Sequence, residues 1–224
     1  AQAGKGETEA AIRTIDKVSG LEWYGVFKGY HTALIADMGG QKAEGAKRMA
    51  QAYGTDTRAL RVVEAQIRFL ARAKKPQEAL AIIADFEKAI PDHPVIEALK
   101  DDIQAGRIPA QIVTTPQAGA AEFLYGLGSA MGRDGGEDIA AMYLQLALWL
   151  TPDSELALIS LAGLEGQMKQ YDKAIAVLER IPGSSRLRPL ADIQVGRYYT
   201  ITQKYDEASK YLRAVIERTP KDLD

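Results

Sequence analysis

The stretch at residues 189–220, PLADIQVGRYYTITQKYDEASKYLRAVIERTP, decides the fold. Within it, Ala208, Leu212 and Val215 recur at offsets of 0, +4 and +7, which is the spacing of one stripe of an α-helix. Pro220 stands where that helix would be stopped. An earlier apolar stripe precedes it across a short polar turn, so the stretch predicts two consecutive helices.

The same pattern recurs towards the N-terminus at a nearly fixed interval. An alanine in an equivalent setting is followed by further apolar residues at helical spacing, clearly in the C-terminal half and less clearly in the N-terminal half. The aligned alanines are Ala11, Ala46, Ala79, Ala140, Ala174 and Ala208. The intervals between them are 35, 33, 61, 34 and 34 residues. A fixed period of this length predicts a repeat protein.

If the aligned alanine is numbered position 20 of a repeat, the three C-terminal repeats have an earlier helix with a small residue at position 8, namely Gly128, Ala162 and Gly196. An aromatic residue near position 11 and a proline at position 32 complete the best repeat. A 34-residue helix–turn–helix unit of this kind resembles the tetratricopeptide repeat (TPR) family. The resemblance implies an all-α fold, a right-handed superhelix (solenoid) of antiparallel helix pairs with about twelve helices. Position 4, usually aromatic in the family, holds Asp192, Leu158 and Leu124, so these repeats are not idealised.

An ordinary alanine-rich helical bundle is the alternative, but a bundle needs no strict period. On the repeat interpretation, we expect degenerate TPR-like repeats over residues 1–92. An extra helix and an irregular, proline-containing joint are expected over 93–118. Three TPR-like repeats follow over 119–224.

The joint can be interpreted in two ways. Pro109 and Pro116 oppose a helix, while Ile108, Ile112 and Val113 predict that the segment packs on something. It is either a structural connection between two repeat arrays, or a segment that lines or covers part of a binding groove.

The composition disfavours several classes of function. The 28 basic and 30 acidic residues give a net charge of −2, so nothing favours nucleic acid as a partner. The absence of cysteine and the presence of only two histidines disfavour metal sites and catalytic triads. His93 lies in a turn between two prolines and is expected at the surface. We therefore expect no enzyme, no cofactor and no metal.

Other features of the sequence bear on the ends of the chain and on its compartment. The chain begins at a second helix and stops soon after Pro220, which suggests a fragment of a longer bacterial TPR protein. No apolar run approaches the ~20 residues of a membrane-spanning helix, so no direct membrane insertion is expected. The mixture of degenerate and good repeats inclines towards the bacterial periplasm over the cytoplasm without fixing the compartment.

In stacked helix pairs, the first helices line the concave groove. The candidate groove residues are Arg68, Arg72, Tyr125, Arg133, Leu156, Ile159, Ile193 and Arg197. Their chemistry predicts a protein or peptide segment that carries apolar side chains and an acidic group, which arginine can hold through two parallel hydrogen bonds. Alternatively, these arginines pair with neighbouring acids such as Glu64 and Glu122.

The leading hypothesis is a non-catalytic protein- or peptide-binding repeat module that uses its concave groove. A self-association scaffold is the second, in which the ends or an exposed apolar stripe pair with another copy, so that a homo-oligomer is possible. The third is a targeting or regulatory arm of an enzyme whose catalytic domain lies outside this fragment.

Overall fold

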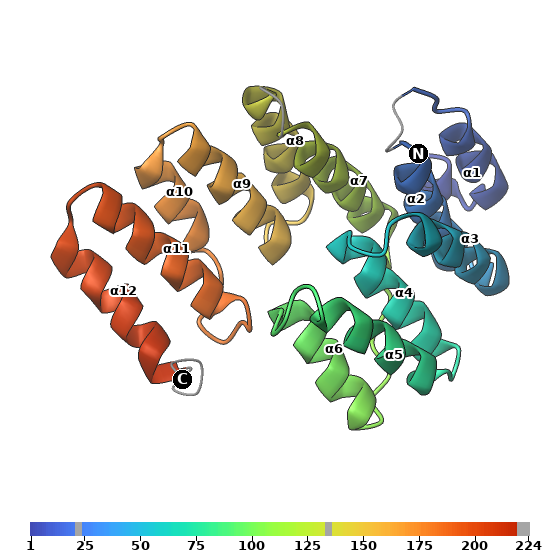
Figure 1. Cartoon of the computed structure of the whole chain (residues 1–224). Coiled ribbons are helices and arrows are strands. Elements are labelled where there is room, and N and C mark those ends of the chain that lie inside the picture. The colour runs from blue at the N-terminus through green and yellow to red at the C-terminus, as the bar shows by residue number, and fades with distance from the viewer. Residues whose placement is uncertain (21–23, 133–135, 219–224) are drawn as a thin grey trace. The chain divides into compact units, whose positions relative to one another are not determined.

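A computed structural model describes residues 1–20, 24–132 and 136–218 of the chain (Figure 1). Twelve α-helices and one short 3-10 helix (Ala3–Lys5) form this described part, which contains no strand. The α-helices are α1 (Thr8–Asp16), α2 (Tyr24–Met38), α3 (Lys42–Thr55), α4 (Leu60–Arg72), α5 (Pro76–Glu87), α6 (Pro94–Gln104), α7 (Pro116–Met131), α8 (Glu137–Leu150), α9 (Glu155–Gln167), α10 (Tyr171–Leu178), α11 (Arg188–Ile201) and α12 (Tyr205–Arg218). The predicted all-α architecture of helix pairs is confirmed.

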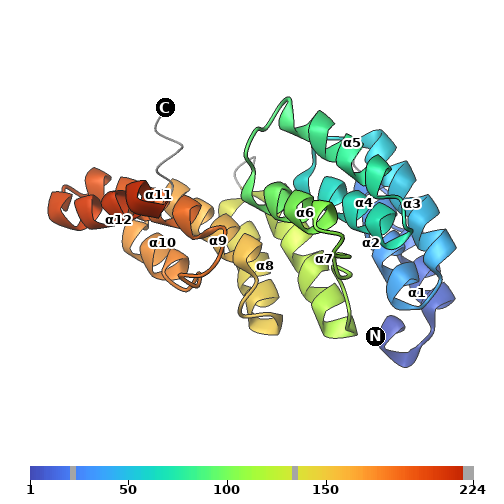
Figure 2. The ribbon, with the colours of Figure 1, turned by 90° about the horizontal axis from the view of Figure 1, so that it is seen from below.

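The chain divides into two compact units, residues 1–119 and 120–224. The first unit contains α1, the pairs α2/α3 and α4/α5, and the additional helix α6. The second contains the three pairs α7/α8, α9/α10 and α11/α12, whose last two can be followed as consecutive hairpins in Figures 1 and 2. Each pair consists of a first helix and a second helix that packs back against it.

The two helices of a pair cross closely at position 8 of the repeat. A Cβ added to Gly128 would lie 2.7 Å from Cγ of Leu144 and 3.0 Å from the carbonyl oxygen of Ala140. In the last pair, a Cβ on Gly196 would lie 2.8 Å from Cγ of Leu212. Positions 8, 20 and 24 therefore meet in both pairs, and the small residue is required because the second helix occupies the space of its side chain.

Ala46 is predicted at position 20 of the α2/α3 pair, and this prediction is wrong. Gly45 is the buried residue at this crossing, while Ala46 is only half-buried. A Cβ on Gly45 would lie 3.1 Å from the carbonyl oxygen of Ala33, which occupies position 8. With Gly45 in place, the interval is 34 residues throughout each unit. Glycine serves the crossing but carries no hydrophobic signal, so the sequence pattern favours the alanine beside it.

The turn has the same backbone form in the four pairs whose turn the structure describes, α2/α3, α4/α5, α9/α10 and α11/α12. Gly40, Lys74, Lys169 and Gln203 each have a positive φ, between 60° and 80°. All four occupy position 15, and Gly6 holds the same place before α1 with a φ of 78°. A left-handed residue costs a non-glycine side chain about 1 kcal/mol, so the packing of the two helices holds three of these turns in a conformation that their side chains disfavour.

Successive second helices are joined by two hydrogen bonds that recur in both units. Position 16 of one repeat bonds position 18 of the repeat before it, and position 23 bonds position 25. The pairs are Gln41–Glu9 (2.7 Å) and Arg48–Asp16 (3.2 Å) in the first unit, and Lys204–Asp172 (3.3 Å) and Tyr211–Glu179 (2.5 Å) in the second. Burial and the bond to Glu179 raise the pKa of Tyr211 to about 12. The repeat period thus also appears in polar contacts between neighbouring second helices, α1 with α3 and α10 with α12.

Helix α6 completes the core of the first unit by packing against α4 and α5. His93 caps its N-terminus, since Nδ1 accepts a hydrogen bond from the backbone N–H of Val95 (3.3 Å). The expected surface position of His93 is therefore corrected: its ring is half-buried, with its edge on Phe86. Burial lowers the pKa of His93, although the charge of Glu64 opposes part of this effect.

The crossing at position 8 predicts opposite effects for two glycine-to-alanine changes. Gly128→Ala should lower the free energy of unfolding by roughly 1–3 kcal/mol, because Leu144 is fully buried and cannot move aside. Gly163→Ala in α9 should raise it by about 0.5–1 kcal/mol, because a Cβ there meets nothing within 4 Å and alanine favours a helix. Urea denaturation of both variants measures the difference. Equal changes in the free energy of unfolding for the two variants would contradict the close crossing at position 8.

The cap of α6 predicts a loss of stability in acid. The fold favours neutral His93, so its contribution is complete above the ordinary pKa of 6.5 and is lost as the pH falls through the lowered value. His93→Asn keeps a capping side chain that does not titrate. Urea denaturation at pH 7 and pH 5 should therefore show a larger loss of stability for the wild type than for the variant. Because all other titrating groups are shared, parallel losses would show that His93 is not responsible.

Candidate partner-binding surface

The first helices of the second unit lie side by side through a repeated contact at a glycine. A Cβ on Gly132, which follows α7, would lie 2.7 Å from Cδ2 of Leu164 in α9. One repeat later, Gly166 faces the ring of Tyr198 in α11. The glycines occupy position 12 and the side chains position 10, so α7, α9 and α11 form one layer. Positions 5 and 9 lie on the other side of these helices from the second helices.

We call this surface the first-helix face of the second unit, and it carries five of the predicted groove residues. They are Tyr125, Leu156, Ile159, Ile193 and Arg197. Tyr125 and Ile159 are half-buried at the edge of the core, and Leu156 is half-buried as well. Ile193 and Arg197 are exposed. Arg133, the sixth candidate in this half, lies outside the described residues.

Helix α11 presents the most exposed part of this face. Ile193, Arg197 and Ile201 follow one another at intervals of four residues, and the two isoleucines are 46% and 48% exposed. Tyr198 anchors the helix beside them, because its hydroxyl donates to the carbonyl oxygen of Ala162 (3.2 Å). Burial raises the pKa of Tyr198. Helix α11 thus presents two exposed isoleucines with the cationic side chain of Arg197 between them.

The two candidate arginines of the first unit are engaged in ion pairs. Arg68 donates twice to Oε1 of Glu64 (3.0 and 2.8 Å). Arg72 donates to both carboxylate oxygens of Asp37 (2.5 and 2.9 Å). Glu64 and Asp37 are only 3% and 5% exposed. A buried carboxylate without its cation is costly, so both arginines have a structural task.

The irregular segment at residues 107–115 covers this part of the first unit. Arg68 donates to the carbonyl oxygen of Ala110 (3.1 Å), and Gln111 donates to that of Asp37 (3.3 Å). Val113 is 4% exposed and joins the core formed by α2, α3 and α4. Ile108, also expected to pack, is 65% exposed. The chain therefore lies on its own first helices, α2 and α4.

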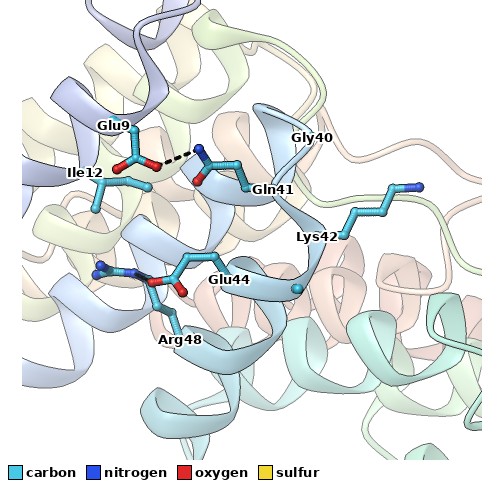
Figure 3. A pocket seen from close by; sticks show the side chains of 8 residues that line it. Glu9, Ile12, Gly40, Gln41, Lys42, Glu44 and Arg48 are labelled. Carbon is cyan, nitrogen blue, oxygen red and sulfur yellow. Dashed lines mark hydrogen bonds and ion pairs between the residues drawn. The ribbon is translucent and has the colours of Figure 1, made fainter.

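A hollow between α1 and α3 is the other concave feature (Figure 3). Its lining residues are Glu9, Ile12, Gly40, Gln41, Lys42, Ala43, Glu44 and Arg48. Gln41 bonds Glu9, and Arg48 bonds Glu44 (2.7 Å) and Asp16. Two of these contacts are the repeat-to-repeat bonds that recur between α10 and α12. The side chains of Glu9, Gln41, Glu44 and Arg48 in this hollow are therefore already engaged in contacts within the chain.

A third buried carboxylate, Asp192, was noted in the sequence only as a departure from the family pattern. It is 2% exposed and accepts hydrogen bonds from Arg188 and Arg218, each at 2.7 Å. The i,i+4 spacing of Arg188 and Asp192 was the only available signal. Arg218 lies 26 residues from Asp192, and no local pattern in the sequence indicates this contact.

Two further features of the described residues bear on function. No three His, Cys, Asp or Glu side chains gather closely enough there to hold a metal ion. None of the helices in the same part of the chain combines the length and the apolar character needed to cross a bilayer.

No family model matches the sequence, and no curated protein matches it. Several solved structures are similar, among them MamA, YrrB and Cut9–Hcn1. MamA is 19% identical, covering 84% of this chain and 94% of its own, with a TM-score of 0.42. YrrB, titled a TPR protein with an unusual peptide-binding site, is 13% identical, covering 96% and 93%, with a TM-score of 0.43. The APC/C hetero-tetramer Cut9–Hcn1 is 12% identical, covering 99% and 45%, with a TM-score of 0.42. Similarity at this level does not show what the chain binds or does, so its function is inferred from its own surfaces.

The packing of residues 107–115 predicts different effects for two neighbouring substitutions. Val113→Ser should remove roughly 1–3 kcal/mol of the free energy that burial of the valine side chain contributes, and so release the segment. Trypsin should then cleave after Arg107 several times faster. Ile108→Ser should change the rate little, because Ile108 is exposed. Gel analysis of timed digests measures both rates. Equal rates for the two variants would mean that Val113 does not hold the segment.

Proposed function

We propose that this chain is a non-catalytic repeat module that binds a segment of a protein partner on the first-helix face of its second unit. The observation that carries the proposal is the exposed line on α11, where Ile193 and Ile201 flank Arg197. The half-buried Leu156 and Ile159 of α9 continue it on the neighbouring helix. Apolar area with a few placed polar groups is the usual composition of a recognition surface.

The first unit is a poorer candidate because its own chain lies on the equivalent helices. Residues 107–115 accept and donate hydrogen bonds there, and Val113 fills the apolar part of that surface. Arg68 and Arg72, which could hold a partner's acid, already hold Glu64 and Asp37. A partner segment would have to displace both the chain and these ion pairs.

The chemistry of the face defines the partner. Isoleucines at intervals of four residues suit apolar side chains from an extended or helical segment. Arg197 suits a carboxylate between them, because a guanidinium binds a carboxylate through two parallel hydrogen bonds. An apolar segment with one acidic residue is therefore the expected ligand.

Four acids are buried among the described residues, and one carboxylate oxygen of Glu165 has no hydrogen-bond partner. The other three have a structural role instead of a role in acid–base chemistry. Asp37, Glu64 and Asp192 are each held by arginine. Such pairing fixes the helices that carry these carboxylates, which is a structural task. If an enzyme domain is linked to this chain elsewhere, the same face would serve as its targeting arm.

Selection of random phage-displayed peptides on the whole chain tests the proposal. We expect enriched peptides to combine apolar residues with Asp or Glu. Ile193→Asp combined with Arg197→Glu should raise the dissociation constant of the enriched peptide roughly tenfold or more, as measured by fluorescence anisotropy. Both changes are on exposed residues, so circular dichroism should show an unchanged fold.

The matched control is Tyr205→Asp combined with Lys210→Glu on α12, which makes the same changes of polarity and charge at exposed positions away from the first-helix face. It should bind as the wild type does. If both double variants bind the enriched peptides equally, the first-helix face is not the binding surface.

A further inference from the structure

Helix α8 is apolar on two opposite faces. Its buried face consists of Ala140, Ala141, Leu144, Ala147 and Leu148. On the other side, Ile139, Met142, Leu146 and Trp149 are 48%, 49%, 43% and 78% exposed. We call these four residues the α8 face. A helix that is apolar on opposite faces is normally covered on both, so the α8 face lacks a cover among the described residues of the second unit.

The other second helices show that the fold does not require this face to be apolar. At the same repeat positions they carry charged, polar or small residues. These are Glu44, Lys47 and Gln51 in α3; Glu78, Ala81 and Asp85 in α5; Lys173, Ala176 and Arg180 in and just after α10; and Glu207, Lys210 and Ala214 in α12. The repeats thus supply an internal comparison in which α8 alone has four large apolar side chains. The difference points to a task other than folding.

We propose that the α8 face binds the α8 face of a second copy of this chain, as an antiparallel helix pair about a two-fold axis. The four residues are spaced by 3, 4 and 3 positions, and this spacing is the same in both directions along the helix. An antiparallel pairing therefore sets Ile139 opposite Trp149 of the second copy and Met142 opposite Leu146. Self-complementarity of this kind is what a two-fold interface requires, and a different partner would not need it.

The area of the α8 face fits a small dimer interface. Together the four residues expose on the order of 500 Å² per copy, so a pairing that covered all of this area would bury about 1,000 Å², which is the lower bound for a specific interface. The partners are apolar at the centre, with Trp149 at each end as the largest anchor. Trp is among the residues that contribute most to interface stability.

One pair of opposite charges near the ends of α8 suits the antiparallel direction, although the exposed Asp153 lies at the same end as Arg180. Asp138 lies exposed in its first turn. At its other end, Arg180 donates to the carbonyl oxygen of Pro152 (2.8 Å) and is itself exposed. Reversing the second helix brings Asp138 of each copy towards the end of α8 at which Arg180 of the other copy lies. A parallel pairing would instead set like charges together.

Sedimentation velocity of the whole chain over a hundredfold range of concentration tests the dimer. The wild type should dimerise. Ile139→Lys, Met142→Ala and Leu146→Arg together install the residues of α10, and should raise the dimer dissociation constant at least tenfold without lowering the melting temperature. The control, Ile193→Lys with Ile201→Arg, removes comparable exposed apolar area from the first-helix face and should dimerise as the wild type does. A wild type that stays monomeric, or a control as monomeric as the triple variant, would overturn the proposal.

Cysteine pairing tests the direction, and the chain contains no cysteine that could interfere. Met142→Cys chains mixed with Leu146→Cys chains should form a disulfide-linked dimer several times faster than either variant alone. In the antiparallel pair residues 142 and 146 lie opposite each other, whereas two copies of residue 142 are offset by about 6 Å along the axis. Equal rates, or no dimer in the mixture, would exclude this pairing.

Discussion

The close crossing of two helices at a small residue is the constraint on which the rest of the structure depends. Where Gly128 lies against Ala140 and Leu144, the second helix occupies the space of a side chain. This contact fixes which stripe of each second helix points inward. It also fixes the 34-residue register, because the next pair must repeat the same approach.

Once the register is fixed, several unrelated features fall at equal positions. The left-handed turn residues Lys74, Lys169 and Gln203 occupy position 15 although their side chains have little in common. The glycine contacts between first helices recur at positions 10 and 12. Such agreement means that backbone geometry repeats more faithfully than sequence. It also makes the outward positions comparable between repeats, and this comparison isolates the α8 face.

The arginines show where prediction from the sequence fails. Arg68 pairs with an acid four residues away, and that spacing made the pairing foreseeable as one of two alternatives. Arg72 pairs with Asp37, 35 residues away, and no local pattern indicates this contact. Arginine on a first helix has the same appearance in the sequence whether it binds a partner or a buried acid of its own unit. Only the packing of α2 against α4 separates the two uses.

The sequence by itself determined the helices, their pairing and the repeat period, because these follow from apolar spacing, small residues at crossings and prolines after helix ends. It could not choose between Gly45 and Ala46, since both are small and only the approach of Ala33 requires the smaller one. It also could not place residues 107–115, whose single proline and three large apolar residues fit a connection or a cover equally well. The tertiary structure decided both, because burial and hydrogen bonding of a non-helical segment depend on surfaces contributed by helices far away in the chain.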